Sequence, residues 1–94
     1  KLGLSAFGYV QISLVDHTEG SIKLFNDFIR TNERVLECAS ITGDFDFLLK
    51  VVAADPEALE EFIMKHILRL GVVRTTTTNF VLRQIKTSGA LPID

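Results

Sequence analysis

The sequence has little of several features that define large classes of protein. Its 94 residues include a single cysteine, Cys38, so no disulfide can form within the chain, and we expect a reducing compartment, the cytoplasm. No apolar run approaches the roughly 18 residues of a membrane-spanning helix, and we expect neither a membrane span nor a signal peptide. Lys and Arg form no cluster larger than a pair, and the formal net charge is -2. We therefore do not expect this chain by itself to bind the phosphate backbone of DNA.

What is present is typical of one small folded domain. The chain is 47% hydrophobic and 23% charged, and its length suffices for one domain rather than two. We expect a folded domain over residues 1–86 and a loose tail over residues 87–94. Because the chain begins at Lys1 and its only methionine is Met64, we expect that an N-terminal segment has been removed.

The hydrophobic periodicity predicts six segments in the order strand, helix, strand, strand, helix, strand. Thr18 and Asp55 are the expected N-caps of the two helices, with Pro56 at a first helical position and Gly71 as the stop of the second helix. The predicted segments are residues 5–15, 18–31, 35–42, 46–54, 55–70 and 72–86.

This order is that of the split βαβ, or ferredoxin-like, fold, which is an α+β arrangement. It has one four-stranded antiparallel sheet with both helices on the same face. The other face would be uncovered and would carry apolar side chains, for which we expect Leu48, Val52, Val81 and Ile85. An exposed apolar face usually marks a partner surface, so we expect the sheets of two copies to pair in a homodimer.

A glycine followed by an acid lies between the third and fourth predicted segments. Gly43 tolerates a positive φ and Asp44 bonds readily to nearby N–H groups, so the pair predicts a tight hairpin turn. The turn leaves backbone donors and two carboxylates, Asp44 and Asp46, at the end of a sheet. A small zwitterion such as an amino acid needs N–H donors for its carboxylate and acids for its ammonium group.

The residues with catalytic or metal-binding chemistry do not form a set. Cys38, His17 and His66 fall in three different segments, which argues against an enzyme. Two acids two residues apart supply too few oxygen ligands for a calcium site, and we predict no metal and no cofactor. We expect Cys38 to be a small core residue, His66 to be packed on the apolar side of the second helix, and His17 to be solvated.

Three stretches together resemble one family. They are Leu2-Gly3-Leu4 before the first strand, the hairpin from Ser40 to Lys50 (SITGDFDFLLK), and a last strand that carries Thr76-x-Thr78 and ends at Ile85-Lys86. The chain resembles, over nearly its whole length, the C-terminal effector-binding domain of the Lrp/AsnC, or feast/famine, transcription regulators.

The resemblance implies a domain that senses amino acids and oligomerises, and no enzyme activity. Family members bind DNA through an N-terminal helix-turn-helix, which this chain lacks, so it is either a truncated regulator or a stand-alone sensing domain. Effector sites of the family lie where dimers meet, often in a ring of four dimers, so a dimer, tetramer or octamer is implied. The effector-binding residues that the resemblance implies here are Gly43, Asp44, Phe45, Asp46, Thr76 and Thr78.

Other interpretations stay open. The chain could be an ACT-like amino-acid-binding module, or an oligomerisation domain without a ligand. The Gly43-Asp44 pair could only turn the hairpin, and Asp46 could pair with Lys50 or Arg83 on the sheet. The run of threonines could serve only to favour a strand.

Overall fold

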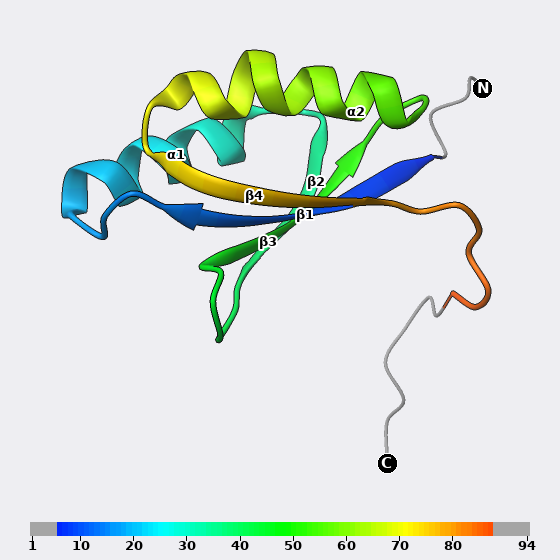
Figure 1. Cartoon of the computed structure of the whole chain (residues 1–94), viewed down its shortest axis with the longest axis horizontal. Coiled ribbons are helices and arrows are strands. Elements are labelled where there is room, and N and C mark those ends of the chain that lie inside the picture. The colour runs from blue at the N-terminus through cyan, green and yellow to red at the C-terminus, as the bar shows by residue number, and fades with distance from the viewer. Residues whose placement is uncertain (1–5, 88–94) are drawn as a thin grey trace.

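The computed structural model of the chain describes residues 6–87 and contains the six predicted segments in the predicted order (Figure 1). The opening Leu2-Gly3-Leu4 and the tail after residue 87 lie outside the described residues. The elements are β1 (Phe7–Leu14), α1 (Glu19–Thr31), β2 (Val35–Ser40), β3 (Phe47–Val52), α2 (Pro56–Phe62), the π-helical turn η1 (Ile63–Ile67), the 3-10 turn η2 (Leu68–Leu70) and β4 (Val73–Phe80).

The four strands form one antiparallel sheet in the order β2-β3-β1-β4. Both helices lie on one face of this sheet, and the hairpin between β2 and β3 extends away from them (Figure 1). The predicted ferredoxin-like α+β fold is therefore confirmed.

Both helices begin where the sequence predicts. The Thr18 hydroxyl accepts a hydrogen bond from the Ser21 N–H at 3.2 Å, which caps α1. The Asp55 carboxylate accepts one from the Ala58 N–H at 2.7 Å, and Pro56 occupies the first position of α2. Each cap satisfies a backbone donor that has no partner within the helix.

The second helix changes its winding before it ends. α2 continues into the wider π turn η1 and then the tighter turn η2, and Gly71 closes it with a φ of +79°. Ile63 and Ile67 are buried, whereas His66 is exposed and its ring lies 5.3 Å from the Phe62 ring. The prediction that His66 is packed on the apolar side of the second helix is wrong, because the residue is exposed to solvent and only its ring lies beside that of Phe62.

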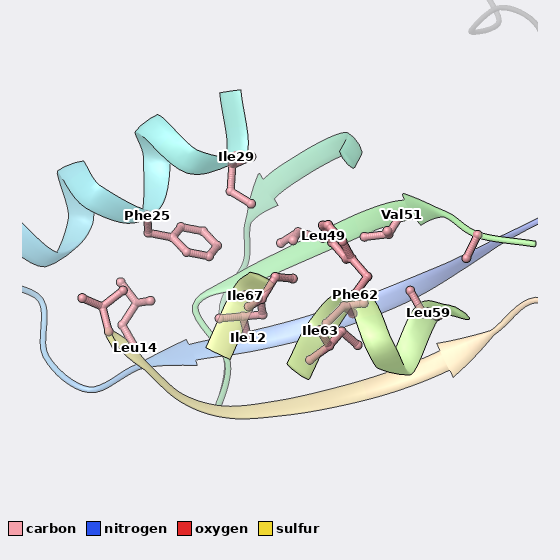
Figure 2. Close-up of a cluster of buried hydrophobic side chains, with 13 residues drawn as sticks. Ile12, Leu14, Phe25, Ile29, Leu49, Val51, Leu59, Phe62, Ile63 and Ile67 are labelled. Atoms are coloured by element: carbon pink, nitrogen blue, oxygen red, sulfur yellow. The ribbon is translucent and has the colours of Figure 1, made fainter. Parts of the chain in front are cut away.

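The core lies between the sheet and the two helices (Figure 2). Phe25 of α1 stacks on Phe47 of β3 with 4.8 Å between the ring centroids. β1 and β3 contribute alternate residues, as expected for strands with one covered face. The buried hydrophobic residues are Val10, Ile12, Leu14, Phe25, Ile29, Leu49, Val51, Ala53, Leu59, Phe62, Ile63, Ile67 and Val72.

Gly8 marks the closest approach of α2 to the sheet. It lies in β1 opposite Val51 on one side and Phe80 on the other. A Cβ placed on Gly8 would collide with the Leu59 side chain of α2 and would lie 3.1 Å from the backbone oxygen of Asn79. The absence of a side chain at this position therefore sets how closely helix and sheet can pack.

The last strand is shorter than predicted. β4 ends at Phe80, and the Val81 N–H still donates to the Phe7 carbonyl at 3.0 Å. β1 itself begins at Phe7, and residues 82–87 lie in no strand. Leu82 and Ile85 are 91% and 84% exposed, and the prediction that Ile85 lies on the uncovered sheet face is wrong.

Cys38 is also placed differently from the prediction. It lies in the edge strand β2, where all residues from Leu36 to Ser40 are exposed. The pairing of β2 with β3 shifts between Val35 and Glu37, so β2 does not keep its alternation against the core. Cys38 is therefore an exposed residue and not a core residue.

The face of the sheet turned away from the helices, which no helix of residues 6–87 covers, is partly apolar. Leu48 and Val52 pair with Gln11 and Phe7, which places them on the side away from the core, as predicted. Both are half-buried, and the Lys50 ammonium lies 4.3 Å from the centre of the Phe7 ring. This face offers an apolar surface of the kind that marks an interaction site.

Candidate functional site

A six-residue loop, residues 41–46, joins β2 to β3. The connection is longer than the tight turn over residues 43–45 that the sequence predicts. Gly43 has a φ of +105°, as predicted, and this conformation is rare for residues with a side chain. At this loop β2 ends at Ser40, two residues before its predicted end, and β3 begins at Phe47, one residue after its predicted start.

Asp46 ties this loop to the end of β1. Its backbone N–H donates to the Ile12 carbonyl at 2.8 Å, and one carboxylate oxygen, Oδ2, accepts from the Leu14 N–H at 2.8 Å. The Ile41 N–H donates to the Asp46 carbonyl at 3.1 Å and closes the loop. Asp46 thus holds both ends of the loop as well as β1.

The second carboxylate oxygen of Asp46, Oδ1, lies 2.9 Å from Nε2 of His17. The pKa of Asp46 is lowered, first by the hydrogen bond from the Leu14 N–H and then by the one from His17, so the group is ionised at neutral pH. An ionised carboxylate can only accept, so Nε2 of His17 carries the hydrogen. The partner of Asp46 is therefore His17, and not Lys50 or Arg83.

The tip of the loop lies on the side of the sheet that faces away from the helices (Figure 1). Gly43 and Asp44 are exposed, and Phe45 is half-buried. A Cβ on Gly43 would have no heavy atom within 4 Å, so the space around the tip is open. The tip therefore offers an exposed backbone and a carboxylate, Asp44, to a molecule outside this chain.

Thr76 and Thr78 lie in a different place. They pair with Ile12 and Val10, whose side chains are in the core, so both threonines face the helix side of the sheet. Thr76 is half-buried and Thr78 is exposed. Thr75, on the opposite side, shares a 2.5 Å hydrogen bond with Ser13.

The six predicted site residues therefore form two groups within one chain. Gly43, Asp44, Phe45 and Asp46 are brought together by the loop at the β2–β3 side. The two threonines are on the other edge strand, and two strand spacings, about 10 Å, separate β4 from β3. The structure does not bring the two groups into one pocket of a single chain.

Two clefts of the domain are lined by none of the six predicted site residues. One of about 440 Å³ is lined by Glu33, Arg34, Val52, Ala53, Ala54 and Ala58, and one of about 300 Å³ by Asn26, Ile29, Arg30, Cys38, Ser40 and Phe47. Over residues 6–87 no three His, Cys, Asp or Glu side chains are placed so that they could hold a metal ion. In the same range, none of the helices has both the length and the apolar character that crossing a membrane requires.

Comparison with known proteins gives relatives along nearly the whole chain. A "Leucine-responsive regulatory protein" of Klebsiella pneumoniae is 33% identical over 92 residues, which is 98% of this chain and 56% of the relative. A "Proline dehydrogenase transcriptional activator" of Rhizobium radiobacter is 33% identical over 95% of this chain and 57% of the relative. The chain thus spans little more than half the length of the curated relatives it matches.

Solved structures show the same fold. A transcriptional regulator of Neisseria meningitidis, solved as a complex with L-methionine, superposes with a TM-score of 0.87 at 27% identity, over 96% of this chain and 58% of that one. An AsnC family regulator of Agrobacterium tumefaciens superposes with a TM-score of 0.83 at 28% identity, over the same shares of the two chains. The family described as "Lrp/AsnC ligand binding domain" matches residues 8–91. The chain belongs to this family of ligand-binding domains of transcription regulators, which are not enzymes.

Proposed function

We propose that this domain binds a small amino acid at an interface between copies of itself and that binding changes how the copies assemble. The single observation that carries the proposal is the separation of the two groups of site residues. The loop tip lies on the side away from the helices, and Thr76 and Thr78 lie on the helix side of the opposite edge strand. A second copy of the chain can place its Thr76 and Thr78 beside the loop 41–46 of the first copy.

The chemistry of the two groups suits a zwitterion. Backbone N–H groups near Gly43 can donate to an α-carboxylate, because glycine allows the ligand to come close to the main chain. Asp44 is exposed and can accept from an α-ammonium group, a charge-assisted hydrogen bond worth about 1.5–3 kcal/mol. Threonine hydroxyls can donate or accept at the other end of the ligand. We assign Asp46 a different role, that of holding the loop, because its carboxylate already accepts from the Leu14 N–H and from His17.

We further propose that the uncovered sheet face forms a homodimer and that dimers join into a tetramer or octamer. The apolar side chains of Leu48 and Val52 on this face favour burial against a second copy. In a full-length regulator the domain would act in the cytoplasm and would pass effector occupancy to a separate DNA-binding part. The relatives named above are regulatory proteins of nearly twice the matched length, whereas this chain matches a ligand-binding domain.

Thermal unfolding in the presence of single amino acids tests the proposal. Each of the twenty amino acids is added at millimolar concentration to the 94-residue chain, and mass in solution is followed by light scattering. A ligand at 100 times its Kd adds about 2.7 kcal/mol to the free energy of unfolding, which raises the Tm by about 10 °C or more. A selective rise with a change in mass supports the proposal. No rise with any amino acid leaves an oligomerisation domain without this class of ligand.

Asp44→Asn separates a binding role from a role in the turn. We expect the variant to bind the amino acid that raises the Tm at least about fivefold more weakly, because it loses one charge-assisted contact. Its own Tm should stay within about 4 °C of the parent, because a surface substitution changes the free energy of unfolding by about 0.5 kcal/mol or less. Glu60→Gln removes an exposed carboxylate from α2 and serves as the matched control. Equal affinity in Asp44→Asn and the parent would exclude Asp44 from the site.

A further inference from the structure

One histidine joins two loops that are far apart in the sequence. His17 lies in the connection between β1 and α1, and Asp46 lies 29 residues later at the end of the β2–β3 loop. Both connections are at the same end of the sheet, and the two side chains meet at 2.9 Å. The contact therefore links the proposed effector loop to the start of the first helix.

The contact occurs where the pairing of β1 with β3 stops. The last paired residues are Ile12 and Phe47, so β3 offers no carbonyl to the Leu14 N–H. Leu14 is only 2% exposed, and a buried N–H without an acceptor costs free energy. The Asp46 carboxylate takes the place of the missing carbonyl at 2.8 Å. The orientation of the Asp46 side chain therefore decides whether the Leu14 N–H at the end of β1 has a hydrogen-bond acceptor.

The backbone around His17 is already ordered. The Asp16 carboxylate accepts hydrogen bonds from both the N–H and the hydroxyl of Thr18, and Thr18 caps α1. The backbone of His17 is therefore held in place, which lowers the conformational entropy that is lost when its side chain contacts Asp46. The side chain is 65% exposed and contributes little to core packing, so its contact with Asp46 is the interaction through which it can act.

The loop tip is attached to the sheet through the same residue. The bonds from the Ile41 N–H to the Asp46 carbonyl and from the Asp46 N–H to the Ile12 carbonyl both involve Asp46. Gly43 and Asp44 lie between these points and have open space around them. The position of the tip relative to the sheet therefore depends on how firmly Asp46 is held.

We propose that His17 is a positioning residue for the effector loop: by holding the Asp46 carboxylate, it fixes the loop 41–46 against β1 so that Gly43 and Asp44 are presented in one arrangement. The role in binding rests on the proposed function, whereas the role in ordering the loop does not. Loss of His17 loosens the loop without unfolding the domain, because the other contacts of the core and of the α1 cap remain.

Hydrogen exchange of the full 94-residue chain tests the ordering role. In His17→Ala we expect the amides of Leu14 and Asp46 to exchange about tenfold faster, because the Asp46 carboxylate loses one of its two anchors. The amide of Val15, which donates to Val72 on the other side of β1, should be unchanged. His17→Gln retains an N–H donor of similar reach and should restore part of the protection. His66→Ala removes the other, exposed histidine and is the matched control.

Calorimetric titration with L-methionine and with L-leucine tests the binding role in the same variants. We expect His17→Ala to bind several-fold more weakly than the parent, with His17→Gln in between and His66→Ala unchanged. Unchanged exchange of Leu14 and Asp46 in His17→Ala overturns the proposal, and so does faster exchange with unchanged affinity. If the parent binds neither amino acid, the proposed function has failed for these ligands, and the exchange measurement alone decides whether His17 orders the loop.

Discussion

Replacing Gly8 by valine is expected to lower the free energy of unfolding by about 3 kcal/mol, because the new side chain overfills a packed core. For a domain of this size the Tm falls by about 10–20 °C. Valine is a good strand former, so strand propensity alone predicts a gain in stability. The expected loss has a steric cause: a Cβ on Gly8 collides with the side chain of Leu59, which is fully buried, and lies 3.1 Å from the Asn79 backbone oxygen. Urea unfolding followed by circular dichroism measures the change.

Gly20→Ala is the matched control for this experiment. Gly20 lies in the first turn of α1, and a Cβ there has no heavy atom within 4 Å. We expect a gain of up to about 1 kcal/mol, because alanine loses less conformational entropy in a helix than glycine does. A Gly8→Val variant as stable as the parent would show that α2 does not pack against β1 as described.

Replacing Asp46 by alanine is expected to lower the free energy of unfolding by about 2 kcal/mol, because the buried Leu14 N–H loses its acceptor. Asp46 lies at the end of the sheet, and the two contacts of its carboxylate give it a structural role. Asp46→Asn keeps one oxygen that can accept from Leu14 and should lose about half as much. Urea unfolding of the three proteins at neutral pH checks this order, and equal stability of Asp46→Ala and the parent would contradict it.

The difference in the free energy of unfolding between the parent and Asp46→Asn is expected to depend on pH. The pKa of Asp46 in the folded domain lies below its ordinary value of 3.8, chiefly because of the hydrogen bond from Leu14. Because this pKa is lowered on folding, the ionised carboxylate stabilises the folded state at pH values above 3.8. The stabilisation is lost as the pH falls through the pKa of Asp46 in the folded domain. His17 and Arg74 are the cationic or titratable groups that act on it. We expect the stability gap between the parent and Asp46→Asn to be wider at pH 5 than at pH 2, whereas a constant gap would contradict the prediction.

Local patterns in the sequence predict the fold well because each depends on a few neighbouring residues. Thr18 and Asp55 cap their helices as expected, and the order of strands and helices follows from periodicity alone. The predictions that are wrong depend on partners distant in the chain. β4 ends at Phe80, which pairs with Gly8 near the start of β1, and Cys38 is exposed because β2 is an edge strand with shifted pairing. Neither the end of a partner strand nor its register is written in the local sequence.

The candidate site shows the same division. The positive φ of Gly43 is a local property and is predicted correctly. The His17–Asp46 contact joins residues 29 positions apart, and nothing near His17 in the sequence indicates it. Alternation places Thr76 and Thr78 on one face of their strand, but only the pairing with Ile12 and Val10 shows that this is the helix side.

The separation of the loop tip from Thr76 and Thr78 has a consequence for stoichiometry. If each site takes its loop from one copy and its threonines from the next, the contact is heterologous, and every copy presents one half of two different sites. A closed ring then holds as many ligands as it has subunits, whereas an open row holds one fewer. Dilution into separate copies leaves no complete site, so the apparent affinity weakens as the protein concentration falls. The number of ligands bound per subunit therefore reports whether the assembly is closed.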